Sequence, residues 1–187
     1  MAKAKPKQFA LGVDYGTSSV RAVIVDCADG AELAGASFAY PTGDDGVMTS
    51  DKDPNVARQH PGDWIKGLEK TVGQALADAE KKRGFSADRI VGIGVDTTGS
   101  TPLPVDRSAR PLALDKQFRT NLAAQAWLWK DHTAYVEAAE ITQKAKESRD
   151  DYLDKCGGTY SSEWFWSKIL KCKRTDAKVF GAAYTWV

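Results

Sequence analysis

The sequence predicts an α/β protein with one mixed sheet, in which the elements follow the order β-β-β-α-β before a helix-rich remainder. Three observations lead to this prediction. Turn signals divide residues 8–40 into three β-rich runs, apolar residues recur at helical spacing after residue 60, and a near-continuous apolar run occupies residues 89–96. With 187 residues, the chain is long enough for one large domain or a little more.

The first three strands are expected at residues 8–14, 19–27 and 32–40. The small residues of Tyr15-Gly16-Thr17-Ser18 form the first turn, and Asp29-Gly30 is a strong hairpin signal before the third strand. Consecutive strands joined by such short turns pair side by side. The chain therefore opens with an antiparallel meander.

A long loop is expected next, because residues 41–59 are polar and are broken by glycines and a proline. A helix then begins near Pro61 and ends before Gly84, with apolar residues at helical spacing. The run RIVGIGVD at residues 89–96 is typical of a strand that is buried on both faces and parallel to its neighbours.

The remainder contains a short expected strand at residues 101–105 and is otherwise rich in helix formers. Helices are expected near residues 121–129, 133–147 and 161–173, with a last one after Lys173. The whole order matches the ribonuclease-H-like arrangement, a mixed sheet with helices on its faces. In such a sheet the first and fourth strands can be neighbours, which would bring Asp14 and Asp96 to one edge.

Composition excludes several classes of function. The net charge is +1 and both signs are mixed along the chain, so there is no electrostatic footprint for nucleic acid. No apolar run approaches the ~20 residues that a membrane span needs. Residues 1–7 are basic without the apolar core of a signal peptide, and we expect a disordered tail. The three cysteines lack C-x-x-C spacing, which predicts buried or half-buried thiols in a reducing cytoplasm rather than a metal site.

Two turns combine a carboxylate with small hydroxyl residues. Asp14 could hold a hydrated Mg²⁺, and the turn after it suits phosphate through its backbone N–H groups and its hydroxyls: Gly16, Thr17, Ser18 and Ser19. Asp96 precedes Thr97-Thr98-Gly99-Ser100, a turn that suits an anion or a polyol. A Walker P-loop and a dinucleotide fingerprint are both absent from the sequence. The alternatives are an ordinary hairpin Asp at 14 and a turn-initiating Asp at 96.

The run WLWKDHT has the chemistry of a sugar-binding surface. The ring of Trp129 would stack on a sugar, Asp131 would accept from hydroxyls, and His132 would donate or accept. The alternative is a helix end, with Trp127 in the core and Asp131 capping the next helix.

A second aromatic run, YSSEWFWSK, ends on Lys168. Ser161 or Ser162 is the expected N-cap of its helix, and most of the aromatic rings are expected in the core. Lys168 could neutralise a phosphate or bind a hydroxyl over this aromatic floor. A surface lysine that keeps its charged end in water is the alternative.

These motifs resemble a known family. GVDYGTSSVRAVIVD resembles the first phosphate motif of the actin-like ATPase superfamily, and specifically the opening of FGGY carbohydrate kinases. GIGVDTTGSTPLPVD, LWKDHTA and GGTYSSEWFWSKIL resemble the subgroup that phosphorylates L-ribulose. The resemblance extends from about Phe9 to Val187. It implies a kinase that uses ATP and Mg²⁺ and acts on a ketopentose such as L-ribulose.

The resemblance also implies roles for individual residues. Mg-ATP phosphates would face Asp14 and the turn that follows it, with Asp14 at the metal. The sugar would be bound by residues from all three later motifs: Asp96, Gly99, Ser100, Trp129, Asp131, His132 and Lys168. Other members of the family tend to have Arg where His132 stands, which weakens any transfer from xylulose or glycerol kinases.

These kinases have two domains, so the resemblance implies that the catalytic base and most adenine contacts lie outside this chain. Residues 184–187 read as an apolar helical run that should continue. We therefore expect residues 8–187 to be an incomplete first domain, inactive alone, without the second (nucleotide) domain. The apolar end at 180–187 would favour self-association, including a homodimer. Two alternatives stay open: a non-catalytic sugar-binding or regulatory module, and a chaperone- or actin-like ATPase.

Overall fold

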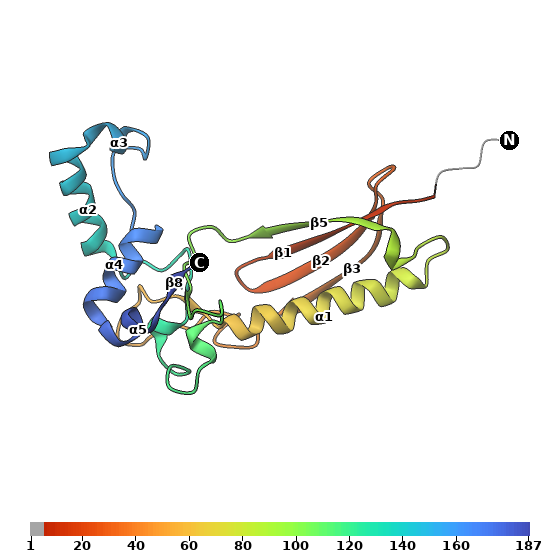
Figure 1. The fold of residues 1–187 in the computed structure, drawn as a ribbon, viewed down its shortest axis with the longest axis horizontal. Helices are drawn as coiled ribbons and strands as arrows, with labels where there is room; N and C mark the ends of the chain where they lie inside the picture. Colours follow the sequence, from red (N-terminus) through yellow and green to blue (C-terminus); the bar gives the residue numbers. More distant parts are fainter. Residues whose placement is uncertain (1–5) are drawn as a thin grey trace. The chain divides into compact units, whose positions relative to one another are not determined.

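The computed structural model describes residues 6–187, which form two compact units (Figure 1). The first unit contains the chain up to Pro41 together with Gly62–Thr97. The second contains Thr42–Pro61 and Thr98–Val187. The predicted phosphate turn lies in the first unit, and the two aromatic runs lie in the second.

The first unit is a four-stranded sheet with strand order β3-β2-β1-β5. β1 pairs antiparallel with β2, β2 pairs antiparallel with β3, and β1 pairs parallel with β5. Helix α1 lies along one face of this sheet (Figure 1). The predicted β-β-β-α-β order is confirmed by these elements: β1 Phe9–Tyr15, β2 Ser19–Asp26, β3 Glu32–Ala39, α1 Pro61–Glu80, the 3₁₀ turn Ala87–Arg89 and β5 Ile90–Thr97.

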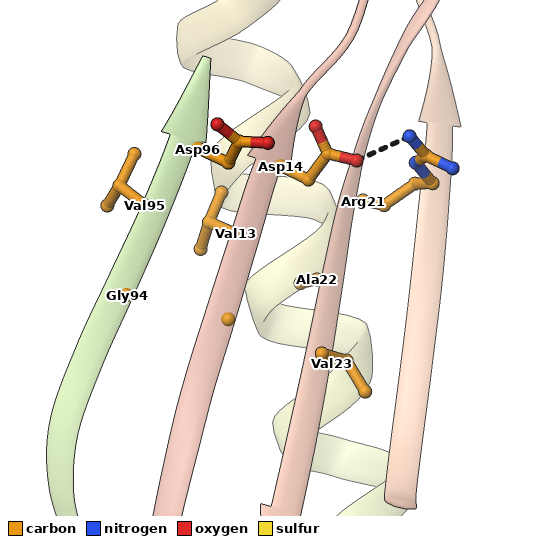
Figure 2. A pocket seen from close by; sticks show the side chains of 9 residues that line it. Val13, Asp14, Arg21, Ala22, Val23, Gly94, Val95 and Asp96 are labelled. Atoms are coloured by element: carbon orange, nitrogen blue, oxygen red, sulfur yellow. Dashed lines mark hydrogen bonds and ion pairs between the residues drawn. The ribbon is translucent and has the colours of Figure 1, made fainter.

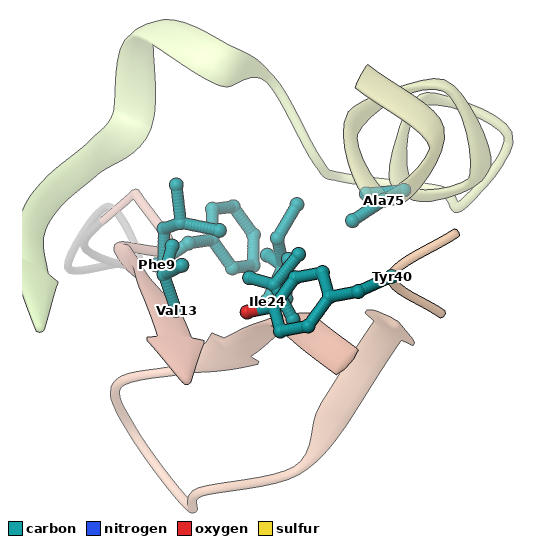
Figure 3. Packing of buried hydrophobic residues seen from close by; sticks show 9 residues of the cluster. Phe9, Val13, Ile24, Tyr40 and Ala75 are labelled. Carbon is teal, nitrogen blue, oxygen red and sulfur yellow. The ribbon is translucent and has the colours of Figure 1, made fainter. Parts of the chain in front are cut away.

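The core of this unit lies between the sheet and α1, as Figure 3 shows. Because side chains alternate along a strand, every second residue of β1 and β2 is buried there. The cluster consists of Phe9, Leu11, Val13, Val20, Ala22, Ile24, Tyr40, Ala75 and Ala79. The same alternation directs Gly12, Asp14 and Arg21 to the opposite face. The packing of the core thus determines which face carries the Asp14 carboxylate.

The prediction that β5 is buried on both faces is wrong. Val91, Ile93 and Val95 are 58%, 68% and 64% exposed. Within the described residues β5 is the last strand of the sheet, with β1 as its neighbour, and Ile90 is the β5 residue that packs against the core. The apolar run did identify the strand and its parallel pairing correctly.

The second unit is built from short strands and helices. β4 pairs antiparallel with β7, and β6 pairs antiparallel with β8. One apolar cluster centres on Trp127, Phe118 and Cys172, and a smaller one contains Val47 and Leu128. The elements are β4 Arg58–Gln59, β6 Pro104–Val105, the 3₁₀ turns Leu112–Leu114 and Leu122–Ala124, β7 Ala126–Trp127, α2 Tyr135–Ser148, α3 Asp150–Asp154, α4 Phe165–Thr175, α5 Ala177–Ala182 and β8 Thr185–Trp186.

Two expected helices are absent where they were predicted in this unit. Residues 121–129 form a 3₁₀ turn and then β7, because the Asn121 side chain accepts from the Ala123 amide and closes a local turn. Residues 184–187 contain the two-residue strand β8, not a continuing helix, and the Val187 carbonyl accepts from the Leu103 amide at 2.8 Å. Both segments satisfy their backbone groups through pairing with distant residues.

Smaller differences concern element ends and side-chain burial. α4 begins at Phe165 with Trp164 as N-cap, so neither Ser161 nor Ser162 caps it. Ser161 Oγ accepts instead from the Glu163 amide, in a turn that precedes the helix. Trp166 is exposed rather than in the core. The strand expected at 101–105 is reduced to the two residues of β6, while β4 and α3 were not predicted.

Cys172 is buried as predicted, whereas Cys27 and Cys156 are exposed. The expected disordered tail lies largely outside the described residues. Within the part of the chain that the structure describes, none of the helices has the length and apolar character required to cross a membrane.

Gly67 and Gly73 provide a matched test of how α1 packs on the sheet. A Cβ at Gly67 would overlap Val20 Cγ1 and lie 3.1 Å from Phe38 Cδ1, whereas a Cβ at Gly73 would have no heavy atom within 4 Å. We expect Gly67→Ala to lower the free energy of unfolding by about 1–3 kcal/mol. Gly73→Ala should raise it by about 0.5–1 kcal/mol, because alanine favours the helix. Urea denaturation followed by circular dichroism measures both, and changes of the same sign would contradict this packing.

Candidate functional site

The turn between β1 and β2 is closed by its own backbone and is held by β3. The Gly16 amide donates to the Ser19 carbonyl at 2.9 Å, and the Tyr40 amide donates to the Ser18 carbonyl at 2.9 Å. A Cβ on residue 16 would lie 3.2 Å from the Ser19 carbonyl oxygen, so the tight turn favours glycine. Ser18 is exposed, and Gly16, Thr17 and Ser19 are half-buried. The predicted phosphate-binding residues thus lie together on one fixed turn.

Asp14 and Asp96 are direct partners in the parallel register of β1 and β5. Figure 2 shows their carboxylates side by side near the ends of the two strands. They line a depression of about 510 Å³ together with residues of β2. The predicted meeting of the two carboxylates at one edge is therefore confirmed. Asp96 also accepts from the Thr97 amide at 3.0 Å, the local bond that the turn-initiating interpretation described.

Arg21 is the residue of this depression that the sequence motifs did not single out. It lies opposite Asp14 in the antiparallel register, and its guanidinium forms an ion pair with Asp14 Oδ2 (Figure 2). Strand alternation placed it on the same face, but no motif distinguished it from other surface arginines. Two neighbouring carboxylates match the donors that a hydrated Mg²⁺ uses, with ligand phosphate oxygens completing the shell. The residues present therefore fit a magnesium ion.

Tyr40 supports the core beneath this turn. Its side chain is buried, and burial is the main cause that raises the pKa of its hydroxyl, with smaller contributions from the negative charges of Tyr15 and Asp14. Tyr40 is therefore protonated at physiological pH, and it acts as a packing residue.

In the second unit, Lys168 is fully buried, which rules out the snorkelling alternative. Its ammonium donates to the carbonyls of Ser100 at 2.8 Å, Leu128 at 2.8 Å and Trp127 at 3.3 Å. These three acceptors match the three N–H donors of a lysine. Lys168 therefore links the Gly99–Ser100 turn to the chain that leads into Trp129, and brings two of the predicted sugar-binding segments together.

The surroundings of Lys168 act on its protonation. Burial and, to a smaller extent, the nearby Arg58 cation lower the pKa of Lys168 to about 7, against the opposing effect of the Glu163 carboxylate. Ser100 has a φ of 52°, in the left-handed region that non-glycine residues rarely adopt. The hydrogen bond from Lys168 helps to hold the turn in this conformation.

Asp131 is also fully buried, and its oxygens are occupied by internal partners. Oδ2 accepts from the Ala57 amide at 2.7 Å and forms an ion pair with Arg58, while Oδ1 accepts from the hydroxyl of Thr133 at 2.6 Å. Trp127 lies in the core, with the Arg58 guanidinium 3.6 Å from its ring centroid. Trp127 thus lies in the core as the alternative interpretation described, but Asp131 does not cap the next helix, whose N-cap is Ala134. Asp131 instead holds the segment at Ala57 and Arg58.

Arg58 was missed because it lies in a stretch read as a polar loop. Burial lowers its pKa to about 9, and its Nε donates to the Leu122 carbonyl at 3.1 Å. It remains a cation at physiological pH and connects four segments of this unit. A lone Arg in a polar stretch gives no signal of such burial.

In the second unit, the exposed members of the predicted sugar site are Gly99, Ser100, Trp129 and His132. Trp129 is 41% exposed. His132 Nδ1 lies 3.0 Å from Ser162 Oγ, and Nε2 lies 3.7 Å from Glu163 Oε1. An exposed indole, an imidazole, a hydroxyl and a carboxylate in one unit provide both stacking and hydrogen bonds for a polyol.

Comparison with known proteins identifies the family. Residues 9–180 match the family model described as "FGGY family of carbohydrate kinases, N-terminal domain". The chain belongs to the FGGY family of carbohydrate kinases. It is 37% identical over 182 residues to a ribulokinase of Vibrio parahaemolyticus, covering 97% of this chain and 31% of that protein. It is 39% identical over 181 residues to a ribulokinase of Shouchella clausii, covering 95% of this chain and 32% of that protein. The chain thus spans about a third of the length of these relatives.

Solved structures agree on the fold of this FGGY chain. A xyloylose kinase from Brucella ovis aligns with a TM-score of 0.74 at 23% identity, over 96% of this chain and 32% of that one. A xylulose kinase from Bifidobacterium adolescentis aligns with a TM-score of 0.68 at 13% identity, over 97% and 32%. The predicted ribonuclease-H-like, actin-like ATPase fold is confirmed.

The burial of Lys168 predicts a specific dependence of stability on pH. The unfolded lysine keeps its proton up to a pKa of 10.5, while the folded one releases it near 7. Between these values the unfolded state binds more protons, so stability rises with pH. We expect the unfolding free energy of the wild type, minus that of Lys168→Met, to increase from pH 7 to pH 9.5. Urea denaturation at several pH values measures it, and a difference that stays constant or falls would contradict the burial of this amine.

Proposed function

We propose that this chain is the N-terminal part of a kinase that transfers the γ-phosphoryl group of ATP to a hydroxyl of L-ribulose. The observation that carries the proposal is the identity of 37% and 39% to two ribulokinases across at least 95% of the chain. The catalytic base and the adenine contacts would belong to parts of the enzyme beyond these 187 residues, since the relatives are about three times as long.

The first unit would serve the phosphates. Phosphoryl transfer requires mainly positioning and neutralisation of charge. Asp14, with Asp96 beside it, would hold Mg²⁺, which neutralises the negative charge of the transferred group when bound. The hydroxyls of residues 16–19 would contact phosphate oxygens directly, as would the backbone amides of this turn other than that of Gly16, which already donates to the Ser19 carbonyl. Arg21 would fix the Asp14 carboxylate through their ion pair.

The second unit would serve the sugar. Trp129 would stack on the C–H face of the pentulose, and His132 would bind one of its hydroxyls, because both side chains are exposed. Gly99 and Ser100 would contribute backbone groups. Lys168 and Asp131 would act by holding these segments in place, since their polar atoms already bond to the protein.

Calorimetric titration of L-ribulose into the 187-residue chain tests this proposal. We expect weak binding by the wild type and about tenfold weaker binding by Trp129→Ala, because a stacked ring contributes on the order of 1 kcal/mol. Trp166→Ala is the matched control, since Trp166 is an exposed indole of the same unit with no role in the proposal. Absence of binding by the wild type, or an equal loss in both variants, would contradict the proposed sugar site.

A further inference from the structure

We propose that Glu163, together with His132 and Ser162, forms a site that binds two neighbouring hydroxyl groups of a polyol, and that Glu163 decides which polyols bind. The proposal rests on the proposed function, because the polyol would be the sugar substrate. Neither Ser162 nor Glu163 belongs to the residues that the sequence assigned to the sugar site. The Glu163 carboxylate would add a hydrogen-bond acceptor to the proposed sugar site, which otherwise consists of the Trp129 ring, His132 and the backbone of Gly99 and Ser100.

The geometry around the imidazole supports this role. Nδ1 lies 3.0 Å from Ser162 Oγ, which is a hydrogen bond. When the Ser162 hydroxyl donates to Nδ1, the ring proton lies on Nε2 and faces Glu163. The distance from Nε2 to Glu163 Oε1 is 3.7 Å, too long for a hydrogen bond between them. A donor and an acceptor thus lie close together without satisfying each other.

A hydroxyl group can fill this arrangement, because it both donates and accepts. One hydroxyl would accept from Nε2–H of His132, and its neighbour would donate to the Glu163 carboxylate. The side chains of His132 and Glu163 are 47% and 37% exposed, so a ligand can reach both. A ligand that lacks one hydroxyl would leave a donor or an acceptor without a partner, and such sites discriminate strongly against it.

Hydrogen bonds to backbone carbonyls hold both segments of the site, the one with His132 and the one with Ser162 and Glu163. The His132 amide donates to the Asn55 carbonyl at 3.0 Å, directly after the buried Asp131. On the other side, the buried Ser167 hydroxyl donates to the Trp164 carbonyl at 2.7 Å, and its oxygen lies 3.0 Å from the Ser161 carbonyl. These bonds hold the turn that presents Ser162 and Glu163. A ligand therefore meets a site whose backbone is already in position.

Glu163 is also coupled to the lysine that holds the Gly99–Ser100 turn. Its negative charge favours the ammonium form of Lys168 and so opposes the lowering of the lysine pKa by burial. Lys168 in turn donates to the Ser100 carbonyl at 2.8 Å. The carboxylate therefore lies within electrostatic reach of the second predicted sugar-binding segment as well as beside His132.

Imidazole nitrogen NMR of the 187-residue chain tests the proposal. The chain has two histidines, so His60 is an internal reference for His132. L-Ribulose should shift the Nε2 signal of His132 and leave that of His60 unchanged. Glu163→Gln should weaken binding about tenfold or more and abolish the shift, because it removes a charged acceptor. Glu147→Gln, an exposed glutamate of α2, is the matched control and should bind like the wild type.

The remaining outcomes separate this proposal from the proposed function. If L-ribulose binds but the His132 signal does not move, or if Glu163→Gln binds as tightly as the wild type, the diol site is wrong while the sugar-binding function stands. If L-ribulose binds nowhere on the chain, both proposals fall. As a second variant, Ser162→Ala should change the His132 signals before any sugar is added, and an unchanged spectrum would contradict the predicted ring orientation.

Discussion

The buried ammonium of Lys168 is the interaction on which the second unit depends most. Its three acceptors come from two segments that lie 68 and about 40 residues away in the sequence. A buried cation is stable only when its donors are satisfied, and here backbone carbonyls satisfy all three. The lysine therefore determines where the Gly99–Ser100 turn lies relative to the chain that carries Trp129. The candidate sugar site is a consequence of that constraint.

A second buried cation, Arg58, extends the same principle. It pairs with Asp131 and stacks on Trp127, and its charge also acts on Lys168. Burial lowers the pKa of Lys168 most, the charge of Arg58 lowers it as well, and the Glu163 carboxylate opposes both. Within residues 127–132, structural and exposed positions alternate closely: Trp127, Leu128 and Asp131 are buried, while Trp129 and His132 face the solvent. The buried residues fix the exposed ones.

The sequence predicted the first unit well because its signals are local. Turn residues and period-two alternation define β1, β2 and β3, and the ribonuclease-H-like order then places Asp14 beside Asp96. The roles of Lys168, Arg58 and Asp131 could not be predicted, since their partners lie 40 to 74 residues away. The helix expected at 121–129 failed for the same reason: β7 forms because Trp127 pairs with Arg58. The exposure of β5 depends on which elements cover it, and periodicity does not reveal this.

Amide hydrogen exchange in Lys168→Met tests the central claim most directly, namely that one ammonium holds two distant segments together. Exchange should be about tenfold faster or more at residues 99–102 and at residues 127–129, with little change in β1 and β2 of the first unit. Unchanged exchange rates in those two segments, or a uniform increase over the whole chain, would contradict the role given to Lys168. In that case the predicted sugar-binding segments would owe their positions to packing rather than to Lys168.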